Sequence, residues 1–96
     1  MYKISIRPLA RNDIKKIWQY SLINWGNKQA DFYISVLAAA IQSLPTNPKI
    51  GIAIDTVREG YRLYHYKHHL IIYHMTADTI EIVRVLGESM LPNIHL

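Results

Sequence analysis

The sequence predicts an α+β domain. An N-terminal strand and an antiparallel helical hairpin pack on a small, mainly antiparallel sheet in the order β-α-α-β-β-β, and a short tail follows. Residues 61–86 hold three short runs of β-branched and aromatic residues, joined by connections short enough to link antiparallel neighbours. Residues 9–44 instead repeat apolar side chains with the period of a helix. These two patterns indicate a helical layer covering a sheet.

The run at residues 69–75 is predicted to be the central strand. Its middle, Leu70-Ile71-Ile72-Tyr73, is apolar on both faces, which is typical of a strand with neighbours on both sides. Runs 61–66 and 80–86 flank it in the sequence. Near the N-terminus, residues 2–7 alternate between apolar and polar side chains, as a half-buried strand does.

Two helices are expected between these strands. The first runs from Leu9 to Asn24, and Gly26 is a good C-terminal stop for it. Asn27 can cap the second helix, and the short link between them makes a hairpin. Both tryptophans are expected between the hairpin and the sheet. The side chains assigned to the core are Ile14, Trp18, Trp25, Tyr33, Leu37 and Ile72.

Two segments are less regular. Residues 49–60 are interpreted either as an edge segment of the sheet or as a packed loop. The tail at residues 87–96 is apolar for a terminus, so it is expected to dock on the body of the protein or on a partner. The whole chain, residues 1–96, is interpreted as one domain.

The composition limits the classes of function. Half of the 96 residues are hydrophobic and there is no cysteine, which fits a packed core in a reducing cytoplasm and excludes thiolate chemistry. No signal peptide or membrane span is expected. The net charge is +4, and Asp13 is the single acid up to position 28. This asymmetry suggests an acidic partner, either nucleic acid or an acidic protein segment, although charge alone favours a solvated helix face.

Two arginines on predicted strands are candidate functional residues. Arg62 shares a strand face with Tyr64 and Tyr66, and Arg84 lies on the last strand. If both project onto one face, they could hold a phosphate or carboxylate, and with a histidine they could form an RNA-cleaving site. The alternative is that they close structural ion pairs, for example with Glu59 or Glu81, and spacing alone favours this alternative.

Four histidines between residues 65 and 74 could suggest a metal site, but their positions in the sequence do not favour one. His65 and His74 lie in predicted strands, and His68 and His69 are adjacent near a turn. No predicted helix carries a pair of histidines four residues apart, as the helical metal-ligand patterns require. We therefore expect no metal and no other cofactor.

A series of short fragments along the chain has a characteristic order and spacing. The fragments are Ala10, Asp13-Ile14, Ile17-Trp18, Tyr20, Trp25-Gly26, Gln29-Ala30, Tyr33, Leu44, Asn47-Pro48, Gly51, Arg58-Glu59-Gly60-Tyr61-Arg62, His69-Leu70-Ile71-Ile72-Tyr73, Ile82-Val83-Arg84-Val85-Leu86, Met90 and His95-Leu96. Together they resemble the ParE toxins of the RelE/ParE superfamily, the toxin halves of bacterial toxin–antitoxin pairs. The resemblance covers nearly the whole chain and rests on the order and spacing of the fragments as well as on their residues.

The resemblance implies a cytoplasmic protein without catalysis of its own that poisons DNA gyrase. It implies neutralisation by a cognate ParD-type antitoxin, through which operator DNA is bound indirectly. One departure is Gly87, where relatives commonly carry a histidine after the last strand. The implied contact residues for the target or antitoxin are Arg62, Tyr64, Arg84, Met90, Leu91, His95 and Leu96.

Two alternatives stay open. The RelE branch shares the fold and cuts mRNA on the ribosome, in which case the catalytic residues would be Arg62, Arg84 and His65. An inactive relative would only form the complex with its antitoxin.

Overall fold

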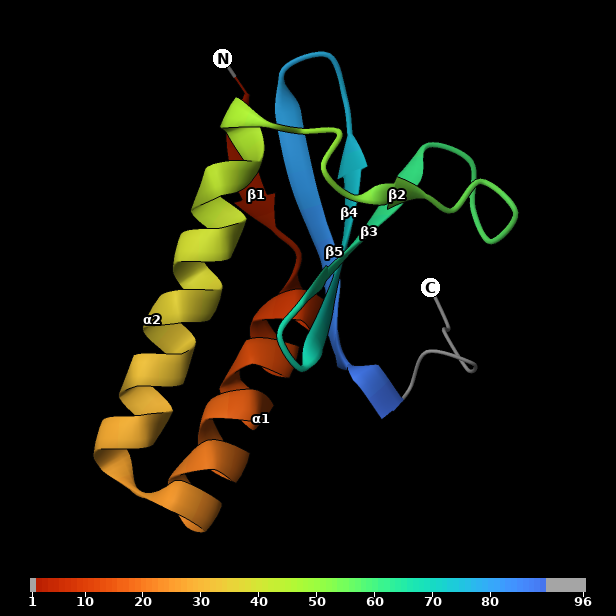
Figure 1. The fold of residues 1–96 in the computed structure, drawn as a ribbon. Coiled ribbons are helices and arrows are strands. Elements are labelled where there is room, and N and C mark those ends of the chain that lie inside the picture. Colours follow the sequence, from red (N-terminus) through yellow and green to blue (C-terminus); the bar gives the residue numbers. More distant parts are fainter. Residues whose placement is uncertain (1, 90–96) are drawn as a thin grey trace.

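A computed structural model describes residues 2–89 of the chain. The predicted contact residues Met90, Leu91, His95 and Leu96 lie outside the described residues. The elements follow the predicted order, and residues 49–60 supply one short edge strand, the first of the two possibilities expected for them (Figure 1). They are β1 (Lys3–Ile6), α1 (Pro8–Trp25), α2 (Asn27–Ser43), a 3₁₀ turn (Leu44–Thr46), β2 (Ile52–Ala53), β3 (Tyr61–Tyr66), β4 (His69–Met75) and β5 (Thr79–Gly87).

The five strands form one sheet in the order β1-β5-β4-β3-β2. β1 runs parallel to β5, and all other neighbours are antiparallel. The predicted α+β class is thus confirmed, with β4 at the centre of the sheet. Leu70, Ile71, Ile72 and Tyr73 are each fully buried, which explains why that run is apolar on both faces.

The two faces of the sheet have different coverings. On one face, side chains of both helices, such as Ala10 and Leu37, pack with Ile71 and Tyr73 of β4. On the other face a second apolar cluster includes Leu63, Leu70 and Ile72, and Ile54 is the one partly buried hydrophobic residue, among those described, that packs against it. Figure 1 shows the hairpin on one side of the sheet. We call the two faces the helix face and the open face, the second because neither described helix covers it.

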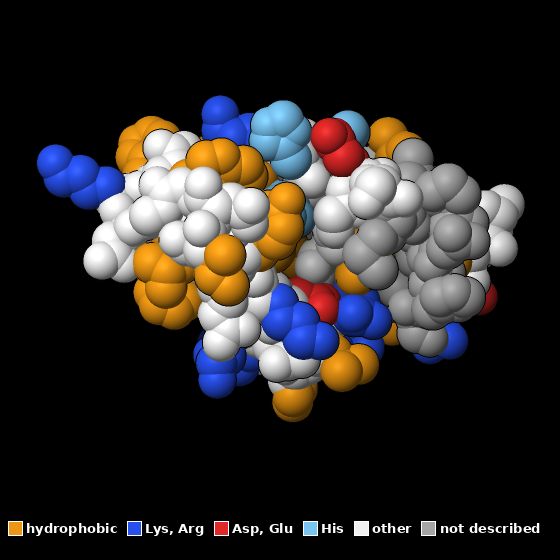
Figure 2. Space-filling model, turned by 90° about the horizontal axis from the view of Figure 1, so that it is seen from below, with side chains coloured by type: hydrophobic (Ala, Val, Ile, Leu, Met, Phe, Trp, Pro, Cys, Tyr) orange, Lys and Arg blue, Asp and Glu red, His pale blue; other side chains and the backbone are white. Residues whose placement is uncertain are grey.

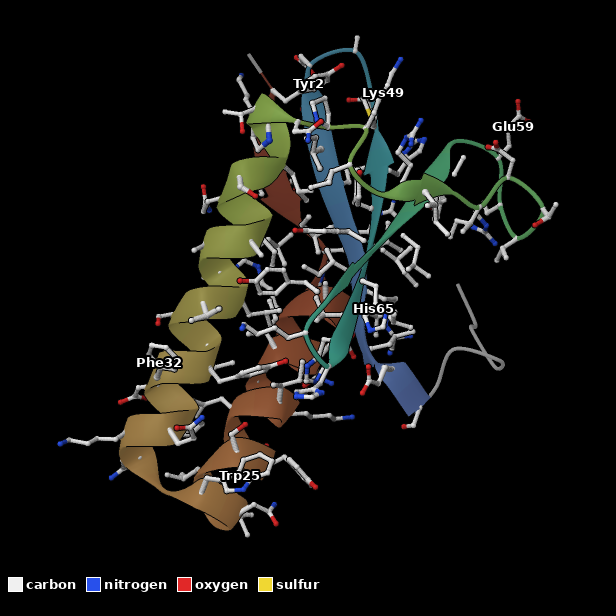
Figure 3. All side chains as sticks on the ribbon, in the orientation of Figure 1. Tyr2, Trp25, Phe32, Lys49, Glu59 and His65 are labelled. Carbon is white, nitrogen blue, oxygen red and sulfur yellow. The ribbon has the colours of Figure 1, made fainter. Side chains whose placement is uncertain are left out.

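The hairpin extends beyond the sheet, and this corrects the prediction for Trp25. Trp25 is 62% exposed and lies at the far end of the hairpin (Figure 3), where no strand is available to pack on it. Trp18 is half-buried, and its indole N–H donates a hydrogen bond to Asp31 of α2 (3.0 Å), so it joins the two helices rather than the helices and the sheet. Leu37 and Ile72 are fully buried, and Ile14 packs partly buried against the core.

The turn of the hairpin also differs from the prediction. Gly26 has φ 87°, a left-handed backbone angle that suits glycine, and its N–H donates to the carbonyl of Leu22 to end α1. The same residue precedes α2 as its N-cap, without a side-chain hydrogen bond. The expected Asn27 cap is therefore wrong, because Asn27 is already the first residue of α2.

Candidate functional site on the sheet and the helical hairpin

Arg84 forms an ion pair with Asp13 of α1. Its Nε donates to Asp13 Oδ2 at 2.7 Å and its Nη2 donates to Oδ1 at 3.0 Å, which is a two-pronged contact. The backbone N–H of Val85 donates to the same Oδ2 at 3.0 Å. These hydrogen bonds raise the pKa of Arg84, so it stays charged at any physiological pH. Arg84 therefore makes a structural contact within the fold.

The position of Asp13 explains this contact. β1 pairs with β5 only as far as Ile6 and Ile82, so beyond that point β5 has no strand on this side. α1 continues alongside β5 there, and the Asp13 carboxylate accepts the N–H of Val85 that a strand would have accepted. Asp13 is 8% exposed although it is charged. The signal in the sequence for this role is a single acid among the basic residues of the first helix.

Arg62 is likewise engaged in a structural contact. It donates to the backbone carbonyl of Gly51 at 2.6 Å, and so holds the loop before β2 against β3. Its cross-strand neighbour Tyr73 secures the same loop, because its hydroxyl donates to the Pro48 carbonyl at 2.6 Å and accepts the Gly51 N–H at 3.0 Å. The half-buried Tyr64 packs against the core on the helix face.

Arg62 and Arg84 do not share a sheet face. The RNA-cleaving site required both to project onto one face, so the structure does not provide that arrangement. Arg62 pairs with Tyr73 on the helix face, whereas Arg84 pairs with Ile72, which belongs to the open face. The reason is a bulge in β5. Ile72 opposes Arg84 but Tyr73 opposes Ile82, so Val83 is the extra residue and the alternation reverses there.

The expected structural partners of the arginines were also partly wrong. Arg84 does close an ion pair, but with Asp13 rather than with Glu59 or Glu81. Glu81 instead pairs with Arg7 (3.1 Å) and lies 3.4 Å from Nδ1 of His74. Arg7 and, less strongly, His74 hold the pKa of Glu81 below its ordinary value.

The remaining histidines have separate partners. His65 and His68 lie 2.9 Å and 3.3 Å from the two carboxylate oxygens of Glu88, and these contacts lower the pKa of Glu88. The Tyr33 hydroxyl and Nδ1 of His69 are hydrogen-bonded, and burial lowers the pKa of His69 and raises the pKa of Tyr33. Between residues 2 and 89, no three His, Cys, Asp or Glu side chains are grouped so as to hold a metal ion.

A groove lies between the hairpin and the free edge of β1. One part, of about 400 Å³, lies between β1 and the end of α2 and includes Arg11 of α1; the other is lined by apolar side chains of both helices and β1. Ile6 and Gln42 line both parts, so the two lie next to each other. β1 is an edge strand, and one side of its backbone is therefore free to pair with an added strand. The lining residues are Tyr2, Ile4, Ile6, Arg11, Ile14, Ile34, Leu37, Ala38, Ile41, Gln42, Pro45 and Thr46.

Comparison with known proteins places this fold and its residues in a family. Residues 4–92 match the family described as the ParE toxin of the type II toxin–antitoxin system parDE. The chain is also 37% identical over 86 residues to Toxin ParE1 of Mycobacterium tuberculosis, covering 88% of each sequence. The chain belongs to the ParE toxin family. It is therefore the toxin component of a type II toxin–antitoxin system, as the resemblance implied.

Two further similarities agree with this ParE assignment. Toxin ParE1 of Caulobacter vibrioides is 36% identical over 95 residues, covering 99% of this chain and 96% of that protein. A solved structure of the chromosomal ParDE TA system from P. aeruginosa superimposes with a TM-score of 0.78, covering 91% of this chain and 96% of that one. At 15% identity the second similarity supports the fold alone. In the described part of this ParE chain, neither helix is long and apolar enough to cross a membrane.

Proposed function

We propose that this ParE toxin acts in the cytoplasm by inhibiting DNA gyrase, and that a cognate ParD-type antitoxin neutralises it. The observation that supports binding rather than RNA cleavage is the engagement of both strand arginines. Arg62 holds the loop at Gly51 and Arg84 holds Asp13, and they lie on opposite sheet faces. A nuclease site needs cationic groups converging on one phosphate.

Gyrase inhibition is tested by running two assays on one preparation of the purified chain. We expect gyrase supercoiling to be inhibited and ribosome-bound mRNA to stay uncut in a translation extract. Arg62→Ala serves as the variant for the nuclease alternative, with circular dichroism to show that it remains folded. Site-specific mRNA cleavage that Arg62→Ala abolishes, together with unaffected gyrase, would replace this proposal with the RelE-type activity.

The groove is the surface that best suits the antitoxin. A disordered segment can gain backbone hydrogen bonds along the edge of β1 while its apolar side chains enter the groove between α1 and α2. Arg11 is placed to receive an acidic residue of that segment. Because a disordered segment that folds on binding can use both features, we propose that the ParD-type partner occupies the groove.

Filling the groove should block the antitoxin. Ala38 lines the groove and its side chain is exposed, so Ala38→Trp adds bulk there without disturbing the core. We expect the affinity for the antitoxin to fall at least about tenfold, or roughly 1.4 kcal/mol. The matched control is Ala39→Trp, an exposed neighbour on α2 that does not line the groove. Titration calorimetry measures both, and equal affinities for the two variants would place the antitoxin elsewhere.

A further inference from the structure

The outer face of α1 carries a line of exposed side chains that the fold does not use. Leu9 is 60% exposed, Tyr20 61% and Ile23 84%. With Lys16 they follow the spacing i, i+7, i+11 and i+14, which places all four on one side of a helix. Single exposed apolar residues are ordinary, but three aligned on one helix face are typical of a binding surface. These four residues are called the α1 stripe.

The α1 stripe is separate from the groove. Arg11 and Ile14, which line the groove, are turned about 150° around α1 from the middle of the stripe, at 100° per residue. The stripe runs from Leu9 to Ile23, a length of about 21 Å at 1.5 Å per residue. It is therefore long enough to contact about four turns of a partner helix.

The ring of Tyr20, in the α1 stripe, contacts a neighbouring aromatic ring. It makes an edge contact with Trp25, with ring centres 5.7 Å apart and planes at 75°. An exposed but positioned tyrosine loses little entropy when it is buried by a partner, and tyrosine and tryptophan are frequent anchors of interfaces.

The charges around the stripe indicate the chemistry of its partner. Lys16 lies within the stripe, Lys15 directly precedes Lys16, and Lys28 lies in the first turn of the next helix, whereas Arg11 is on the groove side of α1. The only acid on α1 is Asp13, which faces Arg84. Figure 2, viewed from the hairpin end, shows hydrophobic side chains at the surface among Lys and Arg side chains. A complementary partner is therefore apolar at its centre and acidic at its rim.

This chemistry favours a different protein as the partner of the stripe over a second copy of the chain or a nucleic acid. A second copy of the chain, with a charge of +4 and the same basic helix, would be repelled. Nucleic acid would supply negative charge, but Leu9 and Ile23 present aliphatic groups that neither bind phosphate nor stack on bases. An acidic, amphipathic helix would match both the apolar line and its basic border.

We infer that the α1 stripe is the surface with which the toxin engages its target protein, through an acidic helical segment of that target. The inference rests on the proposed function only in that the chain acts by binding a protein. It does not depend on that protein being gyrase.

The test compares growth inhibition by variants expressed from an inducible promoter in bacteria. Ile23→Glu removes the most exposed apolar side chain and adds a charge that an acidic partner repels. The matched control is Phe32→Glu, because Phe32 is 63% exposed on the outer side of α2 (Figure 3). Loss of one interface anchor weakens binding on the order of tenfold or more. We expect Ile23→Glu to lose growth inhibition, and Phe32→Glu and Ile23→Met to keep it.

Three measurements on the purified proteins accompany the growth assay. Thermal melts and antitoxin titrations of Ile23→Glu should match those of the unmodified chain. Retained toxicity of Ile23→Glu, equal loss in Phe32→Glu, or absence of toxicity in the unmodified chain would overturn the inference. So would weakened antitoxin binding by Ile23→Glu, or a loss of affinity for a fluorescent duplex oligonucleotide that parallels the loss of toxicity. If toxicity depends on the stripe but gyrase is unaffected, the gyrase proposal fails and the stripe inference stands.

Discussion

Asp13→Ala is expected to lower the free energy of unfolding by about 3–5 kcal/mol, a large part of the stability of a domain this small. The substitution leaves the partly buried guanidinium of Arg84 without its counter-ion, and it leaves the Val85 N–H without an acceptor. Uncompensated buried charge and an unpaired buried donor both destabilise the folded state. Urea denaturation followed by circular dichroism measures the change.

The control for this prediction is Glu81→Ala, which removes the other arginine–carboxylate pair. The side chains of Arg7 and Glu81 are 38% and 30% exposed, so water screens their attraction. We expect that substitution to cost less than about 1 kcal/mol. If Asp13→Ala costs no more than Glu81→Ala, the carboxylate of Asp13 does not hold α1 to β5.

Tyr73→Ala is expected to cost a similar amount, about 3–5 kcal/mol, because it empties a fully buried aromatic site at the centre of the sheet. The site is tightly packed. A Cβ atom added at Gly51 would lie 2.8 Å from the Tyr73 hydroxyl and 2.9 Å from its ring, so only glycine fits against it. The loop at residues 48–51 should therefore loosen with the loss of the ring. Urea denaturation again measures the cost.

Tyr73→Phe separates packing from hydrogen bonding at this position. It keeps the ring but leaves the Gly51 N–H and the Pro48 carbonyl without their partner. We expect a loss of about 1–3 kcal/mol, the usual cost of unsatisfied buried polar groups. A Tyr73→Phe chain as stable as the unmodified one would show that water replaces the hydroxyl and that packing alone holds the loop.

The arrangement of the strands could be predicted well because each strand carries its own pattern. Leu70 to Tyr73 is apolar without interruption, and only a strand covered on both faces buries such a run. The short connections around β4 allowed only antiparallel neighbours. The functional residues were harder to predict, because their roles depend on neighbours distant in the sequence. Asp13 and Arg84, for instance, are 71 positions apart.

The order of the helices and main strands, the position of the central strand and the resemblance to ParE toxins could all be predicted from the sequence. These depend on periodicity, turn residues and the spacing of fragments, all of which can be read along the chain. The tertiary structure alone decided that Trp25 is exposed, because a helical pattern does not show how far a hairpin extends past its sheet. It also decided that Arg62 and Arg84 lie on opposite faces, because a bulge at Val83 reverses the alternation of β5. The position of a bulge depends on how two strands are hydrogen-bonded to each other. It therefore cannot be predicted from the alternation of side chains within one strand.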